Sequence, residues 1–356
     1  MRAWEVESHN PAMSGNTASV WLAFFLLAVG AAVPVQIAPQ RMTTPMQETR
    51  FLRAALCLAV LVLPAPALAV EGGVSPYAKG FAGFMAGVLP PVGNYASYIF
   101  YYLHGSAGAV ARNDIAELNV GANADLHLLE GTWVTDAPFL GGRNGASMAV
   151  SYLDTGLNAT LALPTGAQQV KLHTGGISDS FLSPITLGWD SGNWHWNTDL
   201  LIYVPTGPYY TTQHLNVGKN IWAFMPQLGV TWFDPHSGLD VSGQLTYVTM
   251  TRNDATDYQS GDILHFDWGT GLHFGAKQEW ELGVNGSVMD QLSGDSGRGT
   301  VLGPFKAQSF GVGPAITWHT NWENVPFSFT GKWERDFSSR DTIGGDVFMI
   351  TATAVL

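Results

Sequence analysis

Polar and apolar residues alternate over long stretches of this chain, most clearly in Asp262–Phe274. Leu264, Phe266, Trp268, Leu272 and Phe274 fall on one parity, and His265, Asp267, Gly269, Gly271 and His273 fall on the other. Period two is the side-chain repeat of a β-strand. The stretch is longer than the usual strand of about 5–6 residues and is long enough to cross a bilayer at a tilt, which takes about 9–11 residues. It predicts a transmembrane strand with its aromatic side toward lipid and its polar side toward a lumen.

The same alternation recurs along the chain between turn residues, as is typical of a membrane barrel. The most regular repeats are 118–128, 195–203, 239–247, 279–288 and 327–334. Less regular apolar runs are 98–104, 146–152, 157–163, 182–189, 221–233, 305–318 and 347–355. Single-chain bacterial barrels have an even number of strands. We therefore predict an all-β protein, an antiparallel transmembrane β-barrel of about 12 strands, with Leu157–Leu163 in a hairpin loop and ten or fourteen strands as alternatives.

The polar parity of these strands predicts the residues that face the lumen and any ligand path. They are His195, Asn197, Asp199, Tyr203, His265, Asp267, His273, Glu281 and Asn285. An arginine at Phe266 or Leu282 should then be costly, whereas one at Asp267 or Asn285 should be tolerated in a hydrated lumen.

Composition agrees with a membrane protein. Charged residues make up 12% of the chain, against about a quarter in soluble domains, although hydrophobic residues are at 46%. The formal net charge of −12 excludes nucleic acid as a partner, because duplex binding needs a basic surface. The single cysteine, Cys57, lies in a segment that we expect to be removed, so no disulfide is expected.

Residues 42–69 have the parts of a secretory signal peptide. Arg50 and Arg53 precede the apolar run 54–63, which leads to the small-residue end Ala67-Leu68-Ala69. The apolar run at 20–38 would be hard to reconcile with an export signal behind it, so residues 1–41 are interpreted as a non-native upstream extension.

We predict that the mature protein begins at Val70. Signal peptidase cleaves after an A-x-A end, which Ala67–Ala69 supplies. Intact-mass spectrometry of the purified membrane protein should give the mass of residues 70–356. Recovery of peptides from residues 1–41 in the mature form would contradict both the cleavage site and the late start.

Residues 70–96 form a lead-in before the barrel of residues 97–356. This segment is rich in glycine and proline, which oppose regular ladders, yet its aromatic rings need shelter from water. Its candidate plug residues are Tyr77, Phe81, Phe84, Met85, Pro90, Pro91 and Tyr95. Two interpretations remain open, a hatch folded into the lumen and an irregular segment covering the periplasmic rim.

Several short motifs occur in a fixed order along the mature chain. They are the lead-in run 80–95, Asp179 with Ser183–Trp189, then Tyr203–Tyr209, Asn216–Trp222, Tyr258–Asp262, Gly303-Pro304 and Gly345-Asp346. In this order the chain resembles the family named for the meta-cleavage pathway of phenol degradation. That resemblance implies an outer-membrane barrel that takes up aromatic or other apolar compounds.

The sequence offers little evidence for catalytic or metal-binding residues. His265 and Asp267 lie side by side on one strand face, but spacing fixes no third metal ligand, and no serine has a nucleophile-elbow motif. The loop carboxylates Asp254, Asp257 and Asp262 could bind calcium, although solvated carboxylates are the simpler interpretation. We therefore expect no catalytic residue, no metal site and no cofactor.

Two functional classes follow, with a membrane-embedded hydrolase as a minor third. The first is an outer-membrane channel for passive uptake of small apolar or aromatic solutes. The second is a structural or adhesive barrel with a filled interior. A twelve-stranded barrel is wider than the eight-stranded kind that side chains alone fill, which favours the channel. The expected partners are outer-membrane lipid, the barrel assembly machinery and the solute.

Overall fold

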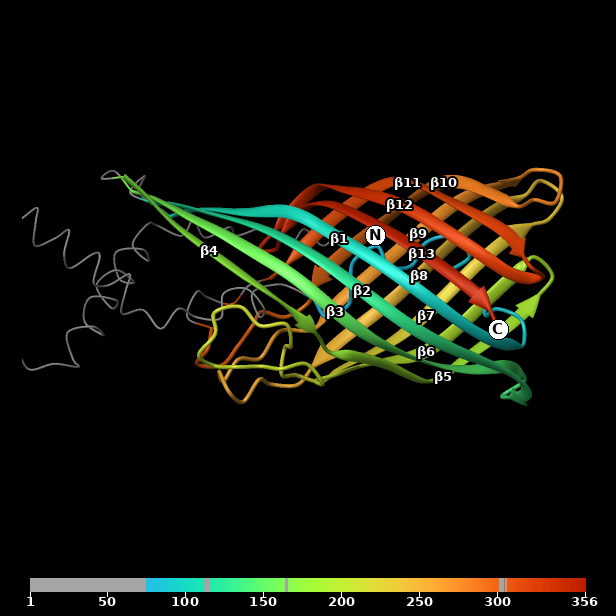
Figure 1. The fold of residues 1–356 in the computed structure, drawn as a ribbon, viewed down its shortest axis with the longest axis horizontal. Coiled ribbons are helices and arrows are strands. Elements are labelled where there is room, and N and C mark those ends of the chain that lie inside the picture. The colour runs from blue at the N-terminus through green and yellow to red at the C-terminus, as the bar shows by residue number, and fades with distance from the viewer. Residues whose placement is uncertain (1–74, 112–115, 164–165, 301–303, 305) are drawn as a thin grey trace, which may run out of the picture. The chain divides into compact units, whose positions relative to one another are not determined.

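The computed structural model describes residues 75–111, 116–163, 166–300, 304 and 306–356, and these form one antiparallel sheet (Figure 1). Its strands are β1 (Gly93–Ala111), β2 (Ala116–Phe139), β3 (Gly142–Leu163), β4 (Gly166–Ile177), β5 (Ser180–Ser191), β6 (Trp194–Val204), β7 (Ala223–Asp234), β8 (Leu239–Met250), β9 (Ile263–Phe274), β10 (Trp280–Gln291), β11 (Gln308–Trp322), β12 (Val325–Arg340) and β13 (Gly344–Val355). Within the described residues, no helix is long and apolar enough to cross a membrane. The expected extension and signal peptide, 1–41 and 42–69, lie outside the described part.

The sheet closes on itself into a barrel. β1 pairs with β13, from Tyr95 opposite Val355 to Ser106 opposite Gly344, and the remaining neighbours follow each other in chain order except that β3 pairs with both β4 and β5. Closure removes exposed edges, which is what allows a sheet to stand in lipid. The all-β, antiparallel, twelve-stranded prediction is confirmed, because β4 and β5 occupy a single place in the ring.

The position that β4 and β5 share in the ring corrects the expected hairpin loop at Leu157–Leu163. β3 pairs with β5 through Arg143–Ala149 and with β4 through Tyr152–Leu163, so β4 and β5 follow one path interrupted at Ser178 and Asp179. Leu157–Leu163 is therefore the end of a strand and not a hairpin loop. The sequence missed β4 because Gly166–Ile177 carries few large apolar residues.

The connections give the barrel its orientation. The turns at 235–238, 275–279 and 323–324 are short, whereas the loops at 205–222, 251–262 and 292–307 are long. Outer-membrane barrels have short periplasmic turns and long extracellular loops. The chain end lies with the short turns, since the amide of Leu356 donates to the carbonyl oxygen of Asn94 (2.8 Å).

Exposure differs sharply between the two parities of β9 and β10. Phe266 and Leu282 are 43% and 51% exposed, whereas Asp267 and Asn285 are 1% and 0% exposed. The aromatic parity forms the lipid-facing surface. Asp267 and Asn285 are therefore not at the hydrated positions that the expected tolerance of arginine assumed, and an arginine at either would disturb packing.

On β1 and β2 the inner wall is apolar. Ile99, Tyr101 and Leu128 are buried, and Leu126 packs against them. The apolar parity of 118–128 thus faces inward where it is described, while Leu129 is exposed outside. The lumen consequently has an apolar side along β1–β3 and a polar side along β8–β12.

β1 begins earlier than expected. Gly93 already pairs with Val134, and Tyr95 pairs with both Thr132 and Val355. Tyr95 is therefore part of the barrel wall and not of the lead-in. The described segment before the first strand is 75–92, which we call the N-terminal segment.

Candidate functional site

The N-terminal segment contacts the polar inner wall through Asp267 of β9. This carboxylate accepts hydrogen bonds from the Tyr77 hydroxyl (2.7 Å) and from the amides of Gly80 and Ala82 (both 3.1 Å). Burial, and then the adjacent Asp267 carboxylate, raise the pKa of Tyr77 well above its usual value, so the phenol keeps the proton that it donates. Hydrogen bonds to a charged acceptor are the strong ones. Asp267 is thus the main anchor of the segment.

Two lysines connect the N-terminal segment to β12, one on the strand and one on the segment. Lys332 of β12 donates to the carbonyl oxygens of Phe81 (3.0 Å) and Ala82 (2.8 Å). Lys79, on the segment itself, forms a buried salt bridge with Asp336 of β12. Because both charges are buried with partners, loss of one partner would leave an uncompensated charge in the lumen.

Glycines let the segment approach the wall closely. A side chain at Gly87 would lie 2.3 Å from the backbone nitrogen of Thr231, whose hydroxyl accepts the Gly87 amide hydrogen (2.8 Å). Phe84 lies against Gly269 of β9, where a Cβ would come within 3.1 Å of its ring. Met85 has a φ of 53° in a tight turn closed by the amide of Val88. Main chain and wall are in direct contact along this side.

The end of the segment leaves the lumen at the periplasmic rim. Arg143 of β3 donates to the carbonyl oxygen of Pro90 (2.6 Å), and the Tyr95 hydroxyl donates to that of Pro91 (2.7 Å). Val92 is 53% exposed. Both sequence interpretations therefore describe part of the segment, the first residues lying in the lumen and the last at the rim.

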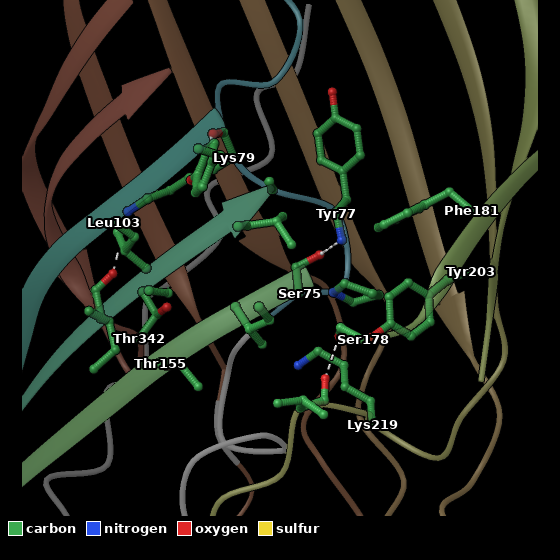
Figure 2. Close-up of a pocket in the computed structure, with 18 of the residues that line it drawn as sticks. Ser75, Tyr77, Lys79, Leu103, Thr155, Ser178, Phe181, Tyr203, Lys219 and Thr342 are labelled. Carbon is green, nitrogen blue, oxygen red and sulfur yellow. Dashed lines mark hydrogen bonds between the residues drawn. The ribbon is translucent and has the colours of Figure 1, made fainter. Parts of the chain in front are cut away.

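A cavity of about 200 Å³ lies between the N-terminal segment and the apolar side of the lumen (Figure 2). Its walls combine Tyr77 and Lys79 of the segment with inward-facing residues of the barrel and loop residues at the extracellular end. The lining includes Tyr101, Leu103, Ala124, Leu126, Leu153, Thr155, Phe181, Tyr203, Val217, Lys219, Met289, Thr342 and Ile343. Its surface is largely apolar.

A second, smaller cavity of about 60 Å³ continues from the first toward the periplasmic end. The two share Tyr77, Ala78, Leu126 and Phe181, and the lining of the second includes Ile99 and Leu128. Along β1 the lining runs in order from Leu103 and Tyr101 to Ile99. We call the two cavities together the apolar track.

Asp179, at the break between β4 and β5, ties the extracellular loop to the wall above the track. Its carboxylate accepts hydrogen bonds from the Tyr203 hydroxyl (2.6 Å) and from the amides of Gly207 and Lys219 (both 2.7 Å). The side chain is fully buried. The loop 205–222 is consequently held over the mouth of the track.

The predicted lumen residues do not form one site. Asn197 donates to the carbonyl oxygen of Ala86 (2.8 Å), Asp199 accepts from Ser183 (3.0 Å), and His195 pairs with Asp190 (2.6 Å). Tyr203 bonds Asp179, and Asn285 bonds Glu334. His265 and Asp267 contact the N-terminal segment, whereas His273 and Glu281 lie together nearer the periplasmic turns.

One pair in the lumen has the form of a hydrolytic dyad. The Nε2 atom of His265 lies 2.9 Å from the Ser75 hydroxyl. A serine triad also needs an acid that orients the histidine. The Nδ1 atom of His265 makes no hydrogen bond within the described residues, so this pair does not have the third group that the hydrolase interpretation requires.

The loop carboxylate Asp257 is paired with arginines. Arg252 and Arg298 lie 2.7 Å and 2.5 Å from its oxygens. The hydrogen bond from Arg298 lowers the pKa of Asp257. Because the two guanidinium groups take the carboxylate oxygens that a calcium ion would need, this arrangement does not favour calcium binding at Asp257.

Sequence comparison matches residues 105–352 to the family described as "Putative MetA-pathway of phenol degradation". No curated protein matches the chain.

Among solved structures, an outer-membrane channel from Pseudomonas putida F1 is similar with a TM-score of 0.54 and 14% identity, covering 80% of this chain and 100% of that one. The translocator domain of the autotransporter NalP from Neisseria meningitidis gives a TM-score of 0.41 and 11% identity, covering 86% and 98%. The first likeness establishes the fold, that of a bacterial outer-membrane β-barrel.

Proposed function

The chain belongs to the MetA-pathway phenol-degradation family, and from that premise we propose that it is a channel for passive uptake of small apolar or aromatic molecules across the bacterial outer membrane. The single observation that carries this proposal is the apolar track. The interior of a membrane barrel is ordinarily polar, so a run of inward-facing apolar residues needs an explanation.

The size and lining of the track suit a single aromatic ring. An engineered apolar cavity of about 150 Å³ stays dry and binds benzene. The larger cavity here has about 200 Å³ and a mainly apolar wall. Tyr77, Tyr101, Phe181 and Tyr203 offer ring faces and edges to a solute. A hydrophilic nutrient would lose its hydration in such a space without gaining hydrogen bonds.

The N-terminal segment would act as the gate of this channel. It covers the polar half of the lumen and forms one wall of the track, so a solute passes between Tyr77 and Phe181. No nucleotide is hydrolysed at the outer membrane, and transport would follow the concentration gradient that metabolism maintains inside the cell.

A bulky residue in the track tests the proposal. Ala124→Phe would fill part of the larger cavity from the β2 wall, whereas Leu129→Phe places the same ring on the same strand but on its outer face, where Leu129 is 62% exposed. We expect Ala124→Phe to slow uptake of a monocyclic aromatic hydrocarbon severalfold, and Leu129→Phe to leave it unchanged.

Uptake would be measured in cells that have a lipopolysaccharide outer leaflet and lack general porins, because lipopolysaccharide limits diffusion of apolar solutes. Surface amounts of folded barrel would be matched by heat-modifiable mobility on gels. Equal uptake by wild type, both variants and a strain without the protein would contradict the channel and favour the structural barrel.

A further inference from the structure

Three side chains from three adjacent strands meet in the lumen near the periplasmic turns. Asp240 is on β8, His273 on β9 and Glu281 on β10. The register brings them together, since Asp240 pairs with Gly271 and Glu281 pairs with His273. One ligand-type atom from each lies within 4.8 Å of the others. Gly271 leaves the space for both carboxylates, because a Cβ there would meet Glu281 at 2.4 Å and Asp240 at 2.7 Å.

Each of these buried groups has one polar atom without a hydrogen-bond partner. Asp240 and Glu281 are 0% and 2% exposed, and the His273 side chain is 9% exposed. Asp240 Oδ2, His273 Nε2 and Glu281 Oε1 make no hydrogen bond within the described residues. Two adjacent carboxylates in such a place repel each other and carry a large desolvation cost unless a cation or a shared proton compensates.

We propose that Asp240, His273 and Glu281 bind a divalent transition-metal ion, with Zn²⁺ the best match. Zinc takes imidazole nitrogen and carboxylate oxygen at about 2.0–2.2 Å, so tetrahedral ligand atoms lie about 3.4 Å apart. His273 Nε2 lies 3.6 Å from a Glu281 oxygen and 3.9 Å from Asp240 Oδ2. Movements of up to about half an ångström bring each carboxylate to that spacing from the imidazole nitrogen, and the two carboxylates lie within 4.8 Å of each other. Calcium and magnesium prefer sites made wholly of oxygen, which the imidazole disfavours.

A second layer orients the ligands and links the site to the gate. The Ser242 hydroxyl donates to Asp240 Oδ1 (3.1 Å), which leaves Oδ2 for the metal. Ser242 lies 2.9 Å from the Thr231 hydroxyl, which in turn accepts the Gly87 amide hydrogen of the N-terminal segment. The metal therefore fastens β8, β9 and β10 beside the point where the segment rests on the wall.

Zinc binding to the folded, full-length barrel in detergent tests the site directly. After chelator treatment and dialysis, ZnCl₂ titration by calorimetry and metal analysis should give one Zn²⁺ per barrel. His273→Ala and Glu281→Gln should each weaken binding by at least about tenfold, the scale on which even supporting residues act. The matched control is His319→Ala, because His319 is an exposed imidazole on the neighbouring strand β11 and does not belong to the cluster.

Thermal unfolding gives a second measurement, which can be made even on a variant that binds zinc poorly. A chelator should lower the unfolding temperature of the wild type and of His319→Ala but leave Glu281→Gln unchanged, since that substitution removes the charge that the metal neutralises. No stoichiometric Zn²⁺ in the wild type would overturn the proposal and leave a proton shared between Asp240 and Glu281 as the compensating group. Binding that is equal in wild type, His273→Ala and Glu281→Gln would also overturn it.

Discussion

Deletion of Ser75–Val92 is expected to leave a folded barrel with a severalfold larger single-channel conductance and a less selective passage of aromatic solutes. The cut ends before β1, which begins at Gly93, so every strand of the ring is kept. The segment lies inside a twelve-stranded barrel, which is too wide for inward-facing side chains alone to fill. Planar-bilayer recordings of the two forms would measure the change.

The charges that the deletion exposes should not unfold the barrel. Asp267, Lys332 and Glu334 would be hydrated by the water that replaces the segment, and Glu334 keeps its hydrogen bond from Ser287 (2.7 Å). An unchanged conductance would contradict the gate and leave the segment with a structural role at the rim. Silence of both forms would favour the structural barrel over the channel.

A point variant can test the gate while the N-terminal segment stays in the chain. Asp267→Asn keeps the size of the anchor but removes the charge that holds Tyr77, Gly80 and Ala82. We expect more frequent openings, since a hydrogen bond to a charged group contributes about 1.5–3 kcal/mol. Asp199→Asn is the matched control, because Asp199 bonds Ser183 and not the segment.

Phe266→Arg is expected to destabilise the folded barrel by up to about 2–4 kcal/mol, the cost that an arginine on the lipid face reaches at the bilayer midplane. Phe266 is 43% exposed and lies between Leu245 and Val288 of the neighbouring strands. Urea titrations of refolding into lipid vesicles would measure the difference in the free energy of unfolding.

Depth should modulate that cost. Leu282 pairs with Leu272, only two residues from the stacked rings of Trp280 and Trp318 at the periplasmic end. Aromatic rings gather at the membrane interface, where an arginine costs about 0–1 kcal/mol, so Leu282→Arg should be milder than Phe266→Arg.

The matched control for Phe266→Arg is an arginine on the inner face of the barrel at a position that is not tightly packed. Asp267 and Asn285 are buried beneath the N-terminal segment or against Glu334, so an arginine at either would disturb packing. Thr132 lies on the inner parity of β2, next to the buried Val134, and its hydroxyl is 3.5 Å from the Glu130 carboxylate, which would pair with an arginine. Thr132→Arg should therefore be tolerated. Equal costs for Phe266→Arg and Thr132→Arg would mean that the assignment of the two faces is wrong.

Period-two alternation determined the strands and the lipid face of most of this protein. The alternation is a local property of the backbone, so Ile263–Phe274 and Trp280–Gln291 could be predicted from their own residues. The same locality gave the polar residues of the lumen. The sequence also contains the ordered motifs that indicate the family, and the match over residues 105–352 confirms that family.

Tertiary structure decided what those faces touch. The alternation at Leu126 and Leu128 could not predict whether these side chains face the lumen or the lipid. An apolar side chain is stable on either face once the N-terminal segment covers part of the lumen. Asp267 pairs with residues almost two hundred positions away, and His273 meets Asp240 and Glu281 only through the register of three strands. Pairing of that kind is set by barrel closure and by the packing of the segment inside it, which no local pattern encodes.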